Sequence, residues 1–313
     1  LPMLAVRTPV TTSVPPEGTI RLPRGFDARR ALATGAVITT SHVLTNIVYS
    51  RTPITENNRL LGVYYRVRGE DDMQVAGARP ILPRTSFNVH LTGTVAHGAL
   101  MLGGAFTDVT GVDPVVSRVL TDDVYSKPEP IYPGQSWYPS QFAAVNRFLG
   151  VDGQSRERLV LVPGQFRPTS QANNRTTGVQ RLYTGLKFEV YHAPFSAQTN
   201  DFTPPSIWQI EAIRGKAALT FRALVEDDAG QVTRVVALYR SAGQTSWTPL
   251  ELAQDSAAGY FTADIPPLPG QVYYFVQAVD ATGNVALALD HGNAFTKITE
   301  QQSKVYLPLI VKQ

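Results

Sequence analysis

The chain has 313 residues, of which 43% are hydrophobic and 17% are charged, and it contains no cysteine. This composition excludes a chain disordered throughout and predicts at least two hydrophobic cores. The missing cysteine excludes disulfides, thiol nucleophiles and cysteine-ligated metals, and a net charge of +3 with scattered arginines argues against a nucleic-acid partner.

Glycine and proline are plentiful, and short stretches rich in Val, Tyr, Phe and Thr recur between turn-forming residues. This pattern is typical of all-β proteins, and we expect tandem β-sandwich domains. No apolar run reaches the roughly 20 residues that a transmembrane helix needs, so we expect no membrane-spanning segment. The chain begins Leu1-Pro2-Met3 without a leader, and we expect a processed N-terminus.

The first half divides into an arm and a domain. Residues 1–35 are rich in proline and small polar residues and predict an extended N-terminal arm or linker, followed by a β-rich sandwich domain at 36–195. The β-branched run 36–49 predicts a strand, either straight or bent, and the alternation over 59–68 predicts a half-buried strand. The stretch 140–149 fits a helix and an extended segment equally. Further strands are predicted at 86–94, 98–106, 115–120, 159–162 and 180–191.

The second half begins after the linker 193–205, where Pro204-Pro205 excludes both a helix and a central strand. Beyond the linker we expect an immunoglobulin-like β-sandwich at 206–298 and a C-terminal strand or tail at 299–313. The expected number of strands, seven, is that of an immunoglobulin-like fold. They are predicted at 207–213, 217–226, 232–240, 247–252, 259–265, 271–280 and 284–288.

The segment 270–286, GQVYYFVQAVDATGNVA, resembles the last hairpin of bacterial immunoglobulin-like and fibronectin type III-like modules. In its turn, Asp280 to Asn284, we expect side chains to bond nearby backbone and Gly283 to adopt a positive φ. The resemblance implies a fold and no particular function, because such sandwiches serve binding, spacing and assembly alike.

Two other segments carry resemblances. The middle region, with Trp137-Tyr138-Pro139, 158–166 and 178–190, resembles the β-rich propeptide or accessory region of gingipain-like peptidases. That family uses a Cys/His pair, and no cysteine here can serve as the nucleophile. The tail 304–312, KVYLPLIVK, resembles the ending of secreted proteins of the Chloroflexus group, which implies export.

No motif for catalysis or cofactor binding is present. The histidines do not form the HExxH pattern of a zinc site, and Ser136 and Ser155 lack the final glycine of a GxSxG elbow. We therefore predict no enzyme, no catalytic residue, no cofactor and no assigned metal. The histidines are His42, His90, His97, His192 and His291.

Acidic residues leave one metal hypothesis open, because calcium stiffens many secreted β-proteins through Asp oxygens. No stretch has EF-hand spacing, and ordinary turns explain the same residues. The segment 226–230 is predicted to be a charged hairpin tip. The calcium candidates are Asp108, Asp113, Asp122, Asp123, Asp227, Asp228 and Asp280.

Surface recognition is the last question that the sequence raises. Asn174-Arg175-Thr176 is a glycosylation sequon in a polar loop, which makes Asn174 the one modification candidate. Six aromatic residues fit either core positions, which we favour, or an exposed sugar platform. They are Tyr64, Tyr65, Trp137, Tyr138, Trp208 and Trp247.

Together these features predict a non-catalytic extracellular or cell-surface structural protein, a subunit of a surface layer, sheath or filament whose partners are copies of itself. Assembly would use the arm or exchange of the 36–49 strand. The alternative is an accessory, propeptide-like or carbohydrate-binding module of a secreted peptidase-like protein, with cell-surface glycans as partners.

Overall fold

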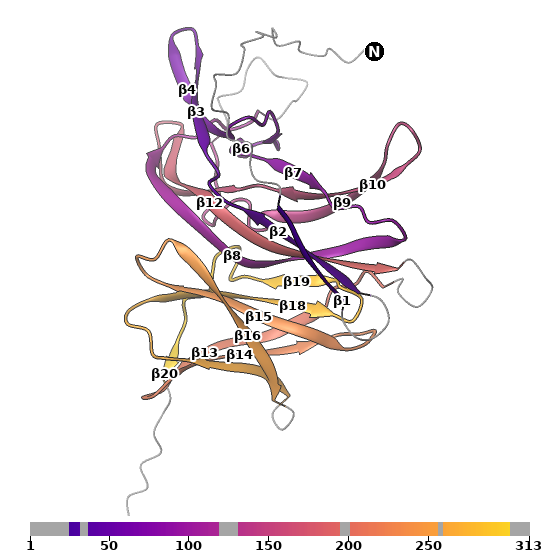
Figure 1. The fold of residues 1–313 in the computed structure, drawn as a ribbon. Helices are drawn as coiled ribbons and strands as arrows, with labels where there is room; N and C mark the ends of the chain where they lie inside the picture. Colours follow the sequence, from indigo (N-terminus) through magenta and orange to yellow (C-terminus); the bar gives the residue numbers. More distant parts are fainter. Residues whose placement is uncertain (1–24, 32–36, 119–130, 195–200, 256–258, 301–313) are drawn as a thin grey trace, which may run out of the picture.

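The structure is a computed structural model that describes residues 25–31, 37–118, 131–194, 201–255 and 259–300. The described residues form twenty strands and no helix, which confirms the all-β prediction (Figure 1). Among them, therefore, no helix offers the length and apolar surface needed to cross a membrane.

The N-terminal half is built on a curved antiparallel sheet with the order β1-β2-β12-β8 (Figure 1). β12 and β8 pair along almost their whole length, with four register shifts that let the long strands bend. Of the single strand predicted at 36–49, only β2 is present among the described residues, between β1 and β12; the chain turns at Asn46, with φ +55°, and Tyr49 already begins β3. β11 pairs with β12 outside this path. The bounds are β1 Gly25–Ala31, β2 Ile38–Leu44, β8 Thr94–Val112, β11 Gly164–Ala172 and β12 Arg175–Pro194.

Three smaller sheets cover the upper part of this half: β7-β10-β9, β3-β4 and β5-β6. The alternation over 59–68 is confirmed as β4, whereas 140–149 contains the strand β9 because it pairs along its whole length with β10. Of the predicted strand 115–120, the described part holds only an isolated bridge at Val116. The bounds are β3 Tyr49–Glu56, β4 Arg59–Val67, β5 Met73–Gln74, β6 Leu82–Pro83, β7 Thr85–Asn88, β9 Ala143–Leu149 and β10 Ser155–Leu161.

All seven strands predicted beyond residue 206 are present, and they form two facing layers. One layer contains β13, β14 and β17, and the other contains β15, β16, β18 and β19; β16 pairs with both β15 and β17 and so links them. A short β20 adds in parallel to β13. The bounds are β13 Ser206–Arg214, β14 Leu219–Glu226, β15 Val232–Ser241, β16 Ser246–Asp255, β17 Tyr260–Ile265, β18 Val272–Asp280, β19 Val285–Ala288 and β20 Thr299–Glu300.

The layer of β15 and β18 is buried on both faces. Val235 and Val276 belong to the core between the two C-terminal layers, whereas Val236 and Phe275 belong to a second core shared with β8 and β12. Successive side chains of a strand point to opposite faces, so the two strands serve both cores at once. The chain thus stacks three sheet layers, with the β15–β18 layer in the middle.

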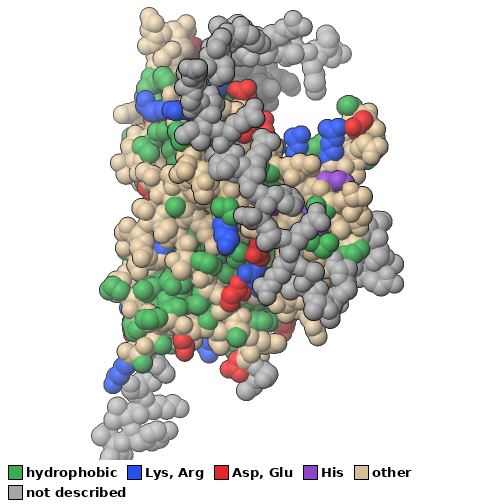
Figure 2. Space-filling model, in the orientation of Figure 1, with side chains coloured by type: hydrophobic (Ala, Val, Ile, Leu, Met, Phe, Trp, Pro, Cys, Tyr) green, Lys and Arg blue, Asp and Glu red, His purple; other side chains and the backbone are tan. Residues whose placement is uncertain are grey.

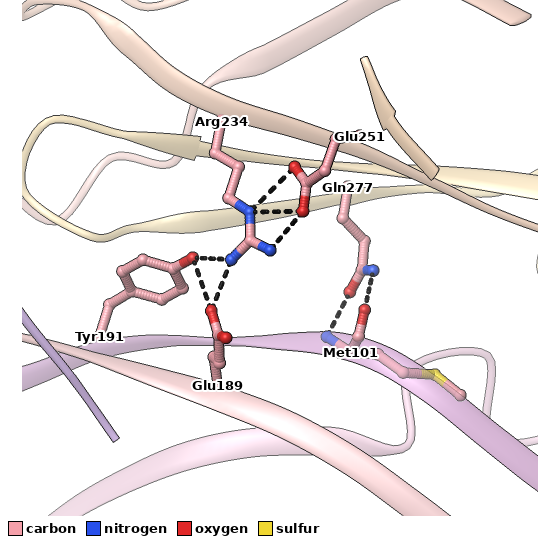
Figure 3. A network of polar contacts seen from close by, with 6 residues as sticks. All are labelled: Met101, Glu189, Tyr191, Arg234, Glu251 and Gln277. Atoms are coloured by element: carbon pink, nitrogen blue, oxygen red, sulfur yellow. Dashed lines mark hydrogen bonds and ion pairs between the residues drawn. The ribbon is translucent and has the colours of Figure 1, made fainter. Parts of the chain in front are cut away.

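Polar contacts also connect the middle layer to the N-terminal sheet (Figure 3). Arg234 on β15 donates from Nη1 to the Tyr191 hydroxyl at 2.8 Å and to Glu189 on β12, and from Nε to both oxygens of Glu251 on β16 at 3.0 and 3.1 Å. Desolvation lowers the pKa of Arg234, whereas Glu251 and Tyr191 raise it. The upward effects together are larger, so the pKa lies above its ordinary value. Arg234 thus bridges carboxylates of two layers.

The β18–β19 turn follows the sequence prediction. Asp280 Oδ1 accepts hydrogen bonds from the backbone N–H groups of Thr282, Gly283 and Asn284 at 2.9, 2.7 and 2.9 Å. Gly283 has φ +93°, and a Cβ there would lie 2.6 Å from Cβ of Tyr191, so glycine also permits the close approach of this turn to β12.

The prediction of a hairpin tip at 226–230 is wrong. This segment leads from β14 in the outer layer to β15 in the middle layer, and the two strands do not pair. Sequence composition identifies the turn but not the sheet that receives the next strand.

Candidate functional site

Three of the histidines, His90, His97 and His291, lie in separate surroundings, and among the described residues no cluster of potential metal ligands includes a histidine. His90 Nδ1 lies 3.6 Å from Glu157 Oε2, while His97 stacks on Phe202 and contacts Asn284 Oδ1 at 3.0 Å. His291 is exposed beside Asp290. These contacts are those of structural or surface histidines.

Two buried histidines meet at one hydroxyl group. Thr40 Oγ1 lies 3.0 Å from His42 Nε2 and 3.1 Å from His192 Nε2, where β2 and β12 pair. Burial lowers the pKa of His42, and burial followed by the nearby His42 lowers the pKa of His192 to about 4. Both imidazoles are therefore neutral at pH 7, and the cluster lies inside the sheet.

The two serines contact polar groups of the scaffold. Ser136 Oγ accepts a hydrogen bond from Asn293 Nδ2 at 3.2 Å, and Ser155, at the start of β10, accepts one from Arg147 Nε at 3.5 Å. Neither an amide nor a guanidinium can act as the base that a nucleophilic serine needs.

The predicted calcium candidates of the first half have other partners or lie outside the described residues. Asp108 forms a two-bond ion pair with Arg181, with both distances 2.8 Å, and Asp113 lies 3.1 Å from Arg175. Asp122 and Asp123 fall in the part of the chain that is not described.

In the second half, Asp227 and Asp280 come together with Asp201, which sequence reasoning assigned only to the linker. One carboxylate oxygen from each lies within 4.8 Å of the others. Desolvation, and next the negative charge of Asp280, raises the pKa of Asp227. Asp280 already accepts hydrogen bonds on both oxygens from its own turn, so the turn explains its position, and structural calcium remains a sequence-based hypothesis.

The six aromatic candidates do not form one exposed row. Tyr65 and Trp247 are core residues, as favoured, with 8% and 7% exposure. Trp137 is partly buried with the guanidinium carbon of Arg181 4.2 Å from its ring centroid, and Trp208 on β13 is 68% exposed. A flat sugar platform made by these residues is therefore absent from the described surface.

Asn174 lies in the tight turn between β11 and β12, exposed and with φ +58°. Thr176, the third sequon residue, is buried and donates from Oγ1 to the Tyr132 carbonyl at 3.3 Å. The turn therefore presents the asparagine outward while the threonine anchors the strand. Glycosylation itself stays a prediction.

Open strand edges are the main feature that sequence reasoning did not locate. β13 pairs with β14 on one side, and on the other side it pairs only at Ile213 and Arg214, with β20. Among the described residues, no strand pairs with the rest of the outer edge of β13. Trp208 on β13 is exposed and lies at a register shift in the pairing of β13 with β14. At the other end of the sheet path, β2 is the one strand of the described ranges that pairs with β1.

These two edges belong to strands at or near opposite ends of one path, β1-β2-β12-β8-β16-β17-β14-β13-β20, whereas β11 and β19, which in the described part of the chain also pair with one strand each, lie off it. Figure 2, drawn in the orientation of Figure 1, shows hydrophobic side chains gathered over the C-terminal layers. Unpaired backbone N–H and C=O groups at a sheet edge can accept a further strand. Comparison with protein-family models and with curated proteins gives no match to this chain.

Proposed function

We propose that this chain is a non-catalytic extracellular structural protein, a subunit of a surface layer, sheath or filament. Copies of the chain would join through strand addition at the open edges of their sheets. The observation that carries the proposal is the continuous sheet path with β1 at one end and the partly unpaired β13 near the other.

The two edges differ from each other, and this difference determines the kind of assembly. Pairing of the β1 edge of one copy with the β13 edge of the next is a head-to-tail contact. Such contacts propagate into rings or open filaments, whereas a contact between identical patches closes a dimer. The exposed Trp208 on β13 supplies apolar area that a neighbouring copy would cover.

The placement of β2 refines how the N-terminal part would act. β2 is enclosed between β1 and β12, so donating it would break two existing ladders. Among the described residues β1 pairs on one side only, which makes it the better candidate for contact with another copy. An extracellular location is supported by the absence of cysteine, which suits export by a bacterium that does not rely on disulfides.

The first test is the assembly state of the purified chain, by sedimentation velocity and negative-stain electron microscopy. We expect polymers from the wild type and loss of polymers from Trp208→Lys, because a charge on an edge strand opposes strand addition. Val151→Lys is the matched control, since Val151 is fully exposed in the turn between β9 and β10, outside the described strands. A monodisperse monomer from the wild type at high concentration would contradict the proposal.

Two truncations separate the arm from the edge strand. Deleting residues 1–24 leaves β1 in place, whereas deleting 1–31 removes it. We expect the shorter deletion to keep assembly and the longer one to abolish it. Normal polymers from the chain without residues 1–31 would show that β1 is not the joining element.

A further inference from the structure

A cavity of about 580 Å³ lies between the N-terminal sheet and the middle layer. Its size is within the range of small-molecule sites, roughly 300–1,000 Å³. Its lining combines arginine, aromatic and amide side chains drawn from both halves of the chain. They include Trp137, Arg181, Arg240, Trp247, Tyr273 and Asn293.

Arg181 is a compensated charge. It is 5% exposed, forms the two-bond ion pair with Asp108, and has its guanidinium carbon 3.8 Å from the ring centroid of Phe106 and 4.2 Å from that of Trp137. A carboxylate with two parallel hydrogen bonds neutralises the guanidinium and fixes its plane. Arg181 therefore needs nothing more from a ligand.

Arg240 is different, because it is 9% exposed and, in the described part of the chain, no carboxylate lies within ion-pair distance of it. Its Nη1 donates only to carbonyl groups, at 3.1 Å to Gln244 and 3.5 Å to Ser241. Its Nε is buried and has no hydrogen-bond partner among the described residues. Burying a charge without a counterion is costly, so an anion that paired with this guanidinium would be bound favourably.

The positive charges outnumber the negative ones inside the cavity. Burial, and next the charge of Arg181, lowers the pKa of Arg240. Asp290 also lines the cavity, but its side chain is 51% exposed and its Oδ1 lies 2.8 Å from His291 Nδ1. The lining holds three arginines, Arg167, Arg181 and Arg240, against the carboxylates of Asp108 and Asp290, and of these five charged groups only Arg181 and Arg240 are buried.

The remaining lining defines the body of the ligand. The Arg240 guanidinium lies 4.2 Å from the ring centroid of Tyr273 and 5.1 Å from that of Trp247, so aromatic rings adjoin the cation. Gln135 and Asn293 add amides. Aromatic rings accept the C–H faces of a sugar, amides bond its hydroxyl groups, and an arginine binds a carboxylate. We propose that the cavity binds an acidic saccharide, with Arg240 pairing with a uronic acid carboxylate.

This site is independent of strand addition, because its lining does not include the open edges of β1 and β13. The test is isothermal titration of the full chain with trigalacturonic acid and with its methyl ester. The ester keeps the sugar body and removes the charge. We expect the acid to bind at least about tenfold more tightly, the effect of one charge-assisted pair.

Arg240→Gln should weaken binding of the acid at least about tenfold and leave the weak binding of the ester unchanged. Arg156→Gln is the matched control. Arg156 pairs with Asp152 on the exposed β9–β10 hairpin, and its substitution changes the net charge by the same amount. Without ligand, Arg240→Gln should keep or raise the Tm, since it removes an uncompensated buried charge.

Should Arg240→Gln fail to fold, Tyr273→Leu provides a second variant that removes the ring beside the guanidinium and should also weaken binding of the acid. Equal affinity for acid and ester, undiminished binding of the acid by the Arg240 variant, or no binding of the acid by the wild type would each overturn the proposal.

Discussion

The contact of two histidines with one threonine determines how a buried part of the N-terminal sheet responds to acid. His192 is fully buried, and the hydroxyl of Thr40 lies within hydrogen-bond distance of one nitrogen of His42 and of His192. Protonation of His192 would place a cation in this site with no carboxylate in the contact, which is why its pKa is about 4.

We therefore predict that His192 makes folding depend on pH between about 6.5 and 4. The unfolded chain binds a proton on His192 near pH 6.5, whereas the folded chain resists protonation until about pH 4. The unfolded state binds more protons in this window, so the contribution is fully present above pH 6.5 and is lost as pH falls, by roughly 3 kcal/mol.

Urea unfolding at pH 7 and pH 4.5 measures this dependence. His192→Gln should flatten it, and His291→Gln, at an exposed histidine, should leave it unchanged. The same slope in the His192 variant and the wild type would assign the acid sensitivity to other groups.

Most single residues that matter here could not be identified from sequence. The Asx turn at Asp280 was predictable because its bonds are local, within four residues. Arg240 and Arg181 look like any other arginines in the sequence, because what distinguishes them is the presence or absence of a distant carboxylate. His42 and His192 meet only because β2 and β12 pair.

At the scale of elements, the side chain of Gln277 on β18 bonds the backbone of β8 next to a register shift, across the interface between layers (Figure 3). The pairing of β8 with β12 shifts register after Met101. The backbone N–H of Met101 donates to Gln277 Oε1 at 3.0 Å, and Gln277 Nε2 donates to the Met101 carbonyl at 2.9 Å. A side chain of the middle layer thus takes the place of a partner strand.

Gln277→Leu should cost roughly 2–4 kcal/mol in the free energy of unfolding, because it leaves two buried backbone groups of Met101 without partners. Gln277→Glu keeps an acceptor and removes the donor, and it should also destabilise. Gln209→Leu, on the exposed face of β13, is the control. Chemical denaturation checks the values. A loss below about 0.5 kcal/mol for Gln277→Leu would mean that other groups bond the N–H and C=O of Met101 in the variant.

Local patterns located the strands well where turn residues delimit them, as in all seven strands after residue 206. They underestimated β8 and β12, predicted only at 98–106 and 180–191, because register shifts let both strands continue their pairing beyond these residues. They could not choose between helix and strand for 140–149, where the partner β10 decides. Long-range pairing overrides local preference at such positions.

At the scale of the whole molecule, the prediction of two tandem sandwiches does not include a layer shared between them, which is the role of the β15–β18 layer. The sequence of β18, VYYFVQAVD, is almost continuously apolar, and every residue but Tyr273 is buried. Such a run is typical of a strand covered on both faces, rather than of one in a two-layer sandwich with a solvated face. Read in this way, the sequence already indicates a third layer.

We predict that the two halves, 36–195 and 206–298, unfold together. Val236, Leu238 and Phe275 share a core with Leu100 and Phe188, so separating the halves would expose apolar surface on the middle layer. Differential scanning calorimetry of the full chain should show one transition whose calorimetric and van't Hoff enthalpies agree.

The fragment 201–300 provides the complementary measurement. It retains the core between its own two layers, but it exposes the other face of β15 and β18, including Leu238 and Phe275. We expect it to have a lower Tm than the full chain and to aggregate, because large exposed apolar patches associate. Leu238→Ser with Phe275→Ser, made in the fragment, should improve its solubility, whereas the same pair in the full chain should destabilise it. A fragment that is soluble and as stable as the full chain would instead support two independent domains, with the shared core contributing little to folding.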